Sequence, residues 1–244
     1  MTSSDFGAFV QGIGFRWIRP ERPMNRVQAS LRARLDRTAW PLDVYITRLP
    51  AHAAELRRLL RPLCRVPRMS TFAYASVINR AVATLPDGAA FVNVGVWHGF
   101  TFLAGLAGNA EQRCIGVDNF SEFGGPKDAF LPRFERLRSA RHEFHEMDYE
   151  RYFAGRHAGP IGVYLYDGEH SYQNQLKGLE AAERFFTKDC IVLVDDTNDD
   201  DPRRATQDFV AARPGKYRTL LDCRTAANGH PTWWNGLMVL RGTG

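Results

Sequence analysis

Residues 91–101 read FVNVGVWHGFT. The first part, FVNVGV, is a short apolar run typical of a buried strand. Gly95 would allow a sharp backbone turn at the end of that strand, and Gly99 would allow a close approach to a ligand where a helix begins. The stretch therefore predicts a strand, a turn and a helix in direct succession, which is the first half of a βαβ unit.

The alternation continues towards the end of the chain. Six further apolar runs follow, at 114–118, 144–148, 161–167, 191–196, 217–221 and 236–240. Helical stretches separate the first six of the seven runs, at 101–108, 127–138, 149–154, 173–186 and 202–212. Alternating strands and helices predict right-handed βαβ units, and therefore a parallel sheet with helices on both faces.

The fold class predicted from this pattern is α/β, with a seven-stranded and mostly parallel sheet. The last connection, 222–235, is rich in turn residues and has no helical pattern. It suits a last strand that returns antiparallel at the sheet edge.

The N-terminal part has a different character. We predict an arm and helical extension over residues 1–69, followed by a domain over residues 70–244. The first 40 residues are irregular in pattern and rich in arginine. This part could be a solvated arm or short helix, a lid, an anion-binding arm, or a contact in a homo-oligomer. Helices are expected at 51–63 and 70–85, the second capped by Ser70 or Thr71.

Composition sets broad limits on function. Of the 244 residues, 44% are hydrophobic and 24% charged, which are globular values and exclude wholesale disorder. The formal net charge of +5 is a mild basic excess and by itself does not indicate nucleic-acid binding. No run approaches the roughly 20 apolar residues of a membrane-spanning helix. The sequence predicts a soluble protein.

The cysteines and the start of the chain bear on the compartment. Cys64, Cys114, Cys190 and Cys223 are far apart and form no CxxC pair. They indicate neither a disulfide framework nor a zinc site, so we expect a reduced, cytoplasmic location. No basic segment precedes the weak apolar patch at the start, and no signal peptide is expected.

Acidic residues close four of the strand-like runs. They are Asp118, Asp148, Asp167 and the pair Asp195 and Asp196. Acids on successive parallel strands lie along the carboxyl edge of the sheet, where open α/β sheets bind ligands. Asp118 follows the second strand and could accept both hydroxyls of a ribose. Asp148, considered alone, is more typical of a helix cap or a turn residue.

Five motifs together, FVNVGVWHGFT, GVDNF, MDY, YLYDGEHSY and IVLVDD, resemble class I S-adenosylmethionine-dependent methyltransferases. The resemblance covers about residues 70–240 and is nearest to the branch of macrolide sugar O-methyltransferases and cephalosporin-hydroxylase-like proteins. It implies a Rossmann-like fold and S-adenosylmethionine as the cofactor.

The same resemblance assigns roles to individual residues. It places Gly95 to Gly99 and Thr101 along the methionine portion of the cofactor, Asp118 on the ribose and Asp148 beside the adenine. Asn93 stands near the cofactor's amino group, where that family usually has an acid. Asparagine can accept a hydrogen bond there but contributes no charge.

Asp167, Asp195 and Asp196 are predicted to form a metal site. The strands that end at Asp167 and Asp195 are neighbours in this topology, so the carboxylates converge and would repel one another without a cation. Hard oxygen ligands suit Mg²⁺ or a similar ion, and the resemblance implies a divalent metal here too. The alternative is that Asp196 caps a turn in a solvated acidic loop.

His170 is predicted to be the general base, with Asp167 as the other candidate. An unperturbed imidazole has a pKa of about 6.5 and can accept a proton from a hydroxyl at neutral pH. The alternative is a cap for the helix that follows. Trp233 and Trp234 could form an apolar wall of an acceptor site or simply cover the sheet edge.

The function predicted from this sequence is methyl transfer from S-adenosylmethionine to a hydroxyl of a small polyhydroxylated acceptor, assisted by a divalent metal. The acceptor class, a sugar or glycosylated natural product, rests on the resemblance alone. Two alternatives are a nicotinamide-dependent oxidoreductase, against which the missing GxGxxG argues, and a non-catalytic binding protein.

Overall fold

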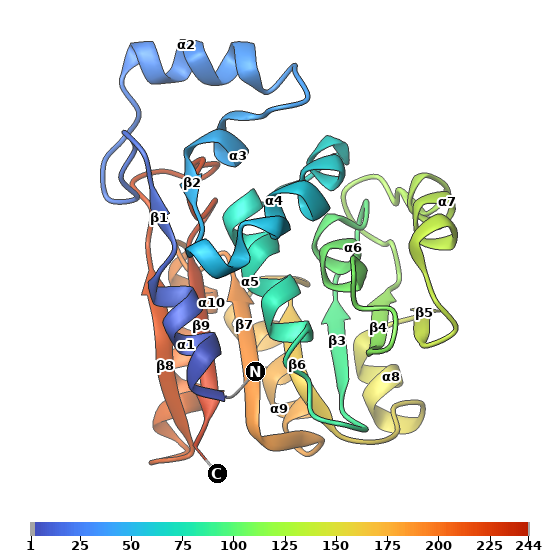
Figure 1. The fold of residues 1–244 in the computed structure, drawn as a ribbon. Coiled ribbons are helices and arrows are strands. Elements are labelled where there is room, and N and C mark those ends of the chain that lie inside the picture. The colour runs from blue at the N-terminus through green and yellow to red at the C-terminus, as the bar shows by residue number, and fades with distance from the viewer. Residues whose placement is uncertain (1–2, 244) are drawn as a thin grey trace.

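The computed structural model describes residues 3–243. A seven-stranded sheet with the order β5-β4-β3-β6-β7-β9-β8 forms its centre (Figure 1). The strands are β3 (Ala90–Val94), β4 (Arg113–Asp118), β5 (His142–Glu146), β6 (Ile161–Tyr166), β7 (Phe186–Asp195), β8 (Tyr217–Cys223) and β9 (Leu237–Gly242). Strands β3 to β7 pair in parallel, and β9 is antiparallel to both of its neighbours. The predicted fold class is confirmed.

The position of the last strand differs from the expected one. Strand β9 lies between β7 and β8, so β8 is the edge strand. Every residue of β9 is buried, whereas β8 exposes Arg218, Thr219 and Asp222. A fully buried apolar strand gains most from neighbours on both sides, and a strand with exposed charges tolerates the edge.

Helices cover both faces of the sheet over separate cores. One face packs against α1 (Ser3–Gln11), α4 (Glu55–Leu60), α5 (Phe72–Val82), α6 (Phe100–Leu106) and α7 (Lys127–Leu137). The other packs against α8 (Tyr149–Gly155), α9 (Tyr172–Glu183) and α10 (Asp200–Ala211). In β3, Phe91 belongs to the first core and Val92 to the second, as the alternation of a strand requires.

The N-terminal extension is more regular than its sequence suggested. Helix α1 packs Phe6 and Phe9 into the same core as α5. Strands β1 (Gly14–Phe15) and β2 (Thr47–Arg48) pair antiparallel, and between them lie α2 (Arg26–Leu35) and α3 (Leu42–Ile46). The helix expected at 51–63 is divided into η1 (Ala51–Ala53), α4 and η2 (Arg61–Arg65). The division of the chain at residue 69 stays a prediction.

The extension stands over the carboxyl edge of the sheet. Figure 1 shows α2 and α3 beyond the ends toward which the parallel strands point. No helix within residues 3–243 is both long enough and apolar enough to cross a membrane.

Candidate active site

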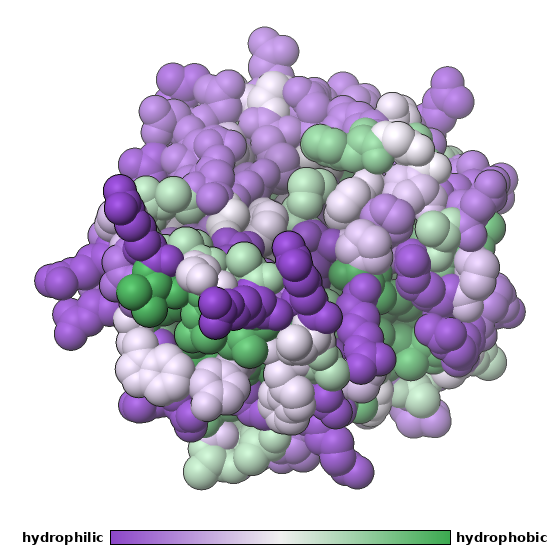
Figure 2. Space-filling view, turned by 90° about the horizontal axis from the view of Figure 1, so that it is seen from above, coloured by the Kyte–Doolittle hydropathy of each residue, from purple (hydrophilic) through white to green (hydrophobic). Residues whose placement is uncertain are grey.

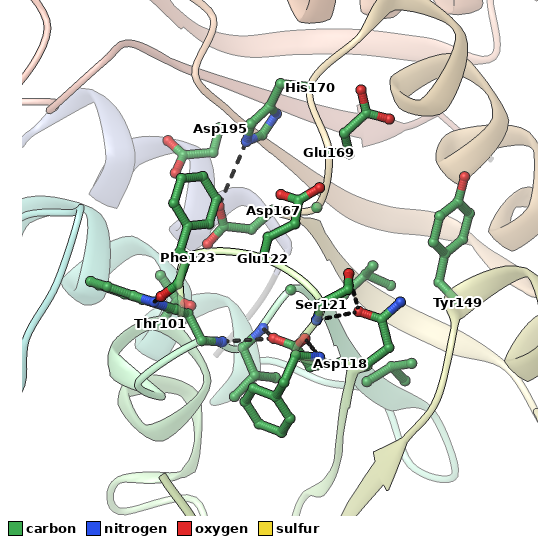
Figure 3. A pocket seen from close by; sticks show the side chains of 18 of the residues that line it. Thr101, Asp118, Ser121, Glu122, Phe123, Tyr149, Asp167, Glu169, His170 and Asp195 are labelled. Carbon is green, nitrogen blue, oxygen red and sulfur yellow. Dashed lines mark hydrogen bonds and ion pairs between the residues drawn. The ribbon is translucent and has the colours of Figure 1, made fainter. Parts of the chain in front are cut away.

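A cavity of about 380 Å³ lies at the carboxyl edge of β3, β4, β6 and β7 (Figure 3). Eight residues predicted from the sequence line it: Gly95, Thr101, Asp118, Asp148, Asp167, His170, Asp195 and Asp196. Two predicted residues, Asn93 and Gly99, lie behind its wall. The structure therefore brings the predicted cofactor residues and the predicted acid cluster to one cavity.

The turn after β3 packs directly against the end of β6. Gly95 has a φ of +79°, and a Cβ atom built on it would lie 1.8 Å from the carbonyl oxygen of Asp167. Only glycine fits at this position. Gly99 has a φ of +97° and precedes α6, where a Cβ would lie 2.7 Å from the ring of Phe130. Gly99 thus serves the packing of α7 against α6 rather than the cavity wall.

Asp118 holds two loops of the cavity wall. Its Oδ2 accepts hydrogen bonds from the backbone N–H groups of Val96 and Trp97, at 2.7 and 2.8 Å, and its Oδ1 accepts from Phe120 N–H at 2.6 Å. A carboxylate offers roughly four acceptor sites. About one therefore remains, so that accepting both hydroxyls of a ribose requires release of a backbone N–H.

Asp148 and Asn93 have structural partners of their own. Asp148 caps α8 by accepting from the N–H groups of Glu150 and Arg151, and it also lines the cavity. Asn93 is fully buried, and its Nδ2 donates to the carbonyl oxygen of Gly95 at 2.7 Å. Its Oδ1 has no hydrogen-bond partner among the described residues. Asn93 supports the turn from behind, and its contact with a cofactor stays a prediction.

The acid cluster sits where β6 and β7 end side by side. Asp167 follows β6, Asp195 ends β7, and Asp196 turns the chain with a left-handed φ of 53°. The Nε2 atom of His170 lies 3.5 Å from Asp196 Oδ2 and 3.9 Å from Asp167 Oδ1. In Figure 3 the His170 ring and the Asp167 and Asp195 carboxylates lie at the same end of the cavity. The predicted convergence of these side chains is confirmed.

Burial makes this cluster costly to ionise. Desolvation raises the pKa of Asp195 and of Asp167 well above the usual range, and repulsion by the charge on Asp196 adds to both. Burial also raises the pKa of Asp196, which His170 and a hydrogen bond from Asn235 oppose. Asp195 is only 2% exposed, and its Oδ1 has no partner among the described residues.

The donor atoms fit a hard divalent cation, because carboxylate oxygens dominate the cluster and one of them is buried and unpaired. Within residues 3–243, however, no group of three or more His, Cys, Asp or Glu side chains is already arranged to hold a metal ion. The donor atoms of the predicted metal site therefore suit a divalent cation, but these side chains are not arranged around one in this structure.

The cavity as a whole is strongly acidic. Its acidic lining residues are Asp118, Glu122, Asp148, Glu150, Asp167, Glu169, Asp195 and Asp196. Arg68 is the one lysine or arginine that lines it. A cleft lined by one sign of charge raises the local concentration of ligands with the opposite sign. This cavity favours a cationic ligand.

Several lining residues were not predicted from the sequence. They include Arg68, Ser70, Phe120, Phe123 and Asn235. The paired glycines Gly124 and Gly125 signal a loop after β4, but such a signal does not identify a cavity wall. Phe123 accepts a hydrogen bond at its carbonyl from the indole N–H of Trp97, which links this loop to the turn after β3.

The two tryptophans separate into different roles. Trp233 is 3% exposed and packs edge-on against Phe15 at a centroid distance of 5.4 Å. It belongs to the core. Trp234 lines a second cavity, beside Arg32 of α2.

Comparison with known proteins bears on the family and the fold of this chain. A family model described as a methyltransferase domain matches residues 92–197. No curated protein matches the sequence. Among solved structures, the TDP-rhamnose 3'-O-methyltransferase of calicheamicin biosynthesis is 19% identical, with a TM-score of 0.55 over 93% of this chain and 99% of that one.

Two further structures are similar. The SAH-bound methyltransferase of Podospora anserina is 13% identical, with a TM-score of 0.54 over 93% of this chain and 100% of that one. The O-methyltransferase of Bacillus cereus in complex with SAH is 13% identical, with a TM-score of 0.52 over 78% and 91% of the two chains. At such identities the likeness shows the fold. With the family match, it confirms the resemblance to class I methyltransferases found in the sequence.

The electrostatics of the acid cluster predict the effect of Asp195→Asn on stability. The raised folded-state pKa of Asp195 means that its ionisation disfavours folding. This penalty is absent below the unfolded pKa of about 4 and grows as the pH rises toward the folded value. At pH 7.5 the variant should gain roughly 1–2 kcal/mol in the free energy of unfolding, and less at pH 4.5. Urea unfolding in the presence of a chelator measures both.

Asp87→Asn is the matched control, because Asp87 is exposed in the turn before β3 and should change stability by less than about 0.5 kcal/mol. An Asp195→Asn variant less stable than the wild type at pH 7.5 would show that the carboxylate stabilises the fold.

Proposed function

We propose that this chain, whose residues 92–197 match a methyltransferase domain, transfers the methyl group of S-adenosylmethionine to a hydroxyl oxygen of a small polyhydroxylated acceptor. The observation that carries the proposal is the acidic cavity at the carboxyl edge of the sheet. The turn after β3 lines this cavity together with His170 and three carboxylates.

The cavity fits the cofactor in charge and in hydrogen bonding. S-adenosylmethionine supplies a methyl group on a positively charged sulfur, and the acidic lining favours such a cation. Asp118 retains about one acceptor site for a ribose hydroxyl. The exposed side chain of Phe123, on the loop after β4, is available to cover the cofactor.

Methyl transfer between two bound partners is an in-line displacement, so the protein's main tasks are alignment and removal of one proton. The acceptor oxygen gains the methyl group and loses its proton. Nε2 of His170 is the proposed proton acceptor, and the carboxylates of Asp196 and Asp167 lie 3.5 and 3.9 Å away to stabilise the resulting imidazolium. Asp167 is the second candidate for this role.

A divalent cation, Mg²⁺ by preference, is part of the proposal. When bound it would polarise the acceptor hydroxyl as a Lewis acid. Asp167, Asp195 and Asp196 would hold it, and the buried, unpaired Oδ1 of Asp195 supports this assignment. The sugar-like acceptor is supported by the sequence resemblance and by the similar fold of a TDP-rhamnose methyltransferase.

Cofactor choice separates this proposal from the oxidoreductase alternative. In isothermal titration calorimetry, S-adenosylhomocysteine should bind at one site with a micromolar dissociation constant, and NAD should not bind. Asp118→Ala should weaken S-adenosylhomocysteine at least 10-fold, because it removes the ribose acceptor and frees two loops. Glu111→Ala is the control, because Glu111 is exposed just before β4 begins, at the end of this strand that faces away from the cavity. Binding of NAD alone would favour the oxidoreductase.

Metal binding has its own test. At ten times its dissociation constant, Mg²⁺ should stabilise the wild type by about 1.4 kcal/mol, a rise in Tm of roughly 3–5 °C for a chain of this size. Asp196→Asn should remove this rise, and Asp87→Asn should keep it. Equal Mg²⁺ effects in all three proteins would refute the site.

The base assignment is tested by His170→Gln, which keeps a polar side chain of similar reach but cannot accept the proton. We expect kcat to fall about 10²- to 10⁴-fold while the affinity for S-adenosylhomocysteine stays within about threefold. Transfer of labelled methyl to the best acceptor from a panel of hydroxylated compounds gives the rate. Glu111→Gln, at an exposed position that does not line the cavity, should keep full activity. Unchanged rates in His170→Gln would remove the imidazole from the reaction.

A further inference from the structure

A second cavity of about 500 Å³ lies between the N-terminal extension and the loop before β9. Arg32, Arg37, Arg65, Pro231 and Trp234 are among its lining residues. Figure 2 views the molecule from the side of α2, and this surface is largely hydrophilic.

The second cavity adjoins the cofactor cavity. Arg68 and Ser70 line both, and the consecutive residues Trp234 and Asn235 line one cavity each. A single molecule could therefore occupy the second cavity and present a hydroxyl to the acid cluster in the first.

The two cavities carry opposite charge. Four arginines and two aspartates line the second one. Two of the arginines are neutralised: Arg32 pairs with Asp36 at 3.1 Å, and Arg68 holds both oxygens of Asp43 at 2.7 and 2.9 Å. Arg37 and Arg65 have no ion-pair or hydrogen-bond partner among residues 3–243. Two guanidinium groups thus remain available for a ligand.

A buried hydroxyl in the shared wall also lacks a partner. Ser70 is 3% exposed, and its Oγ makes no hydrogen bond to any described residue. Its backbone carbonyl is fixed, because it accepts a hydrogen bond from Arg68 at 2.8 Å. Buried polar groups are normally paired in folded proteins, so an unpaired hydroxyl that lines two cavities indicates a ligand contact.

We propose that the second cavity binds an oxyanion, a phosphate or carboxylate group, of the methyl acceptor. Arg37 and Arg65 are the guanidinium donors, and Ser70 contacts the acceptor where the two cavities meet. Guanidinium groups match the paired oxygens of such anions. The acidic first cavity repels an anion, so the arginines hold that part of the acceptor outside while its hydroxyl enters. The assignment to an acceptor rests on the proposed function, whereas the anion site does not.

Calorimetry on the full chain tests the anion site, with pyrophosphate and malonate as probes. The wild type should bind at least one of them at a single site, and the tighter probe identifies the oxyanion. The double variant Arg37→Gln, Arg65→Gln should weaken that binding at least 10-fold. Arg34→Gln, Arg58→Gln is the matched control, because both arginines are exposed on the same extension but line neither cavity. The control should bind within twofold of the wild type.

Equal weakening in both double variants, or no binding by the wild type, would overturn the anion site, because the first result indicates only general surface charge. Saturating S-adenosylhomocysteine should leave the probe's affinity within threefold, and mutual exclusion would place the anion in the cofactor cavity and refute the proposal. If S-adenosylhomocysteine fails to bind while the arginine-dependent binding persists, the proposed function fails and the anion site stands.

Discussion

The contact between the turn after β3 and the end of β6 is the constraint on which the site depends. Backbone hydrogen bonds hold that turn on both sides: Gly95 N–H donates to the carbonyl oxygen of Val117, and Asp167 N–H donates to that of Val94, each at 2.9 Å. The missing side chain of Gly95 lets the two segments touch. Because the cofactor side of the cavity begins at this turn and the acid cluster begins at Asp167, one backbone contact fixes the distance between them.

The separation of charge between the two cavities follows from the fold. Parallel strands bring their terminal acids together at one edge, and the extension stands over that edge with its arginines. The carboxylates are desolvated by the buried strands on which they sit, which raises their pKa values and disfavours the charged state. The sheet thereby gathers acidic groups whose ionisation is disfavoured by burial and would be favoured by a bound cation, at a cost in stability that other packing must offset.

The sequence predicted what depends on local pattern and chain direction. Alternating apolar runs and helices indicated the sheet, and acids after successive strands indicated the edge at which Asp118, Asp167 and Asp195 meet. It could not predict the place of β9, because hydrophobicity alone does not set strand order. Nor could it predict that three backbone N–H groups would donate hydrogen bonds to the carboxylate of Asp118, because those hydrogen bonds depend on loop conformations set by tertiary contacts.

Those loop conformations tie the site to the rest of the molecule. Trp97, Phe120, Phe123 and Asp196 are non-glycine residues with a left-handed φ, and all four line the first cavity. Each such residue costs of order 1–3 kcal/mol and persists only where its surroundings over-determine it. The carboxylate of Asp118 accepts hydrogen bonds from the backbone N–H groups of Trp97 and Phe120. The side chain of Asn235 forms a hydrogen bond with Asp196. The side chains that fit a ligand therefore also hold strained backbone in place, so the cavity is shaped before any ligand enters it.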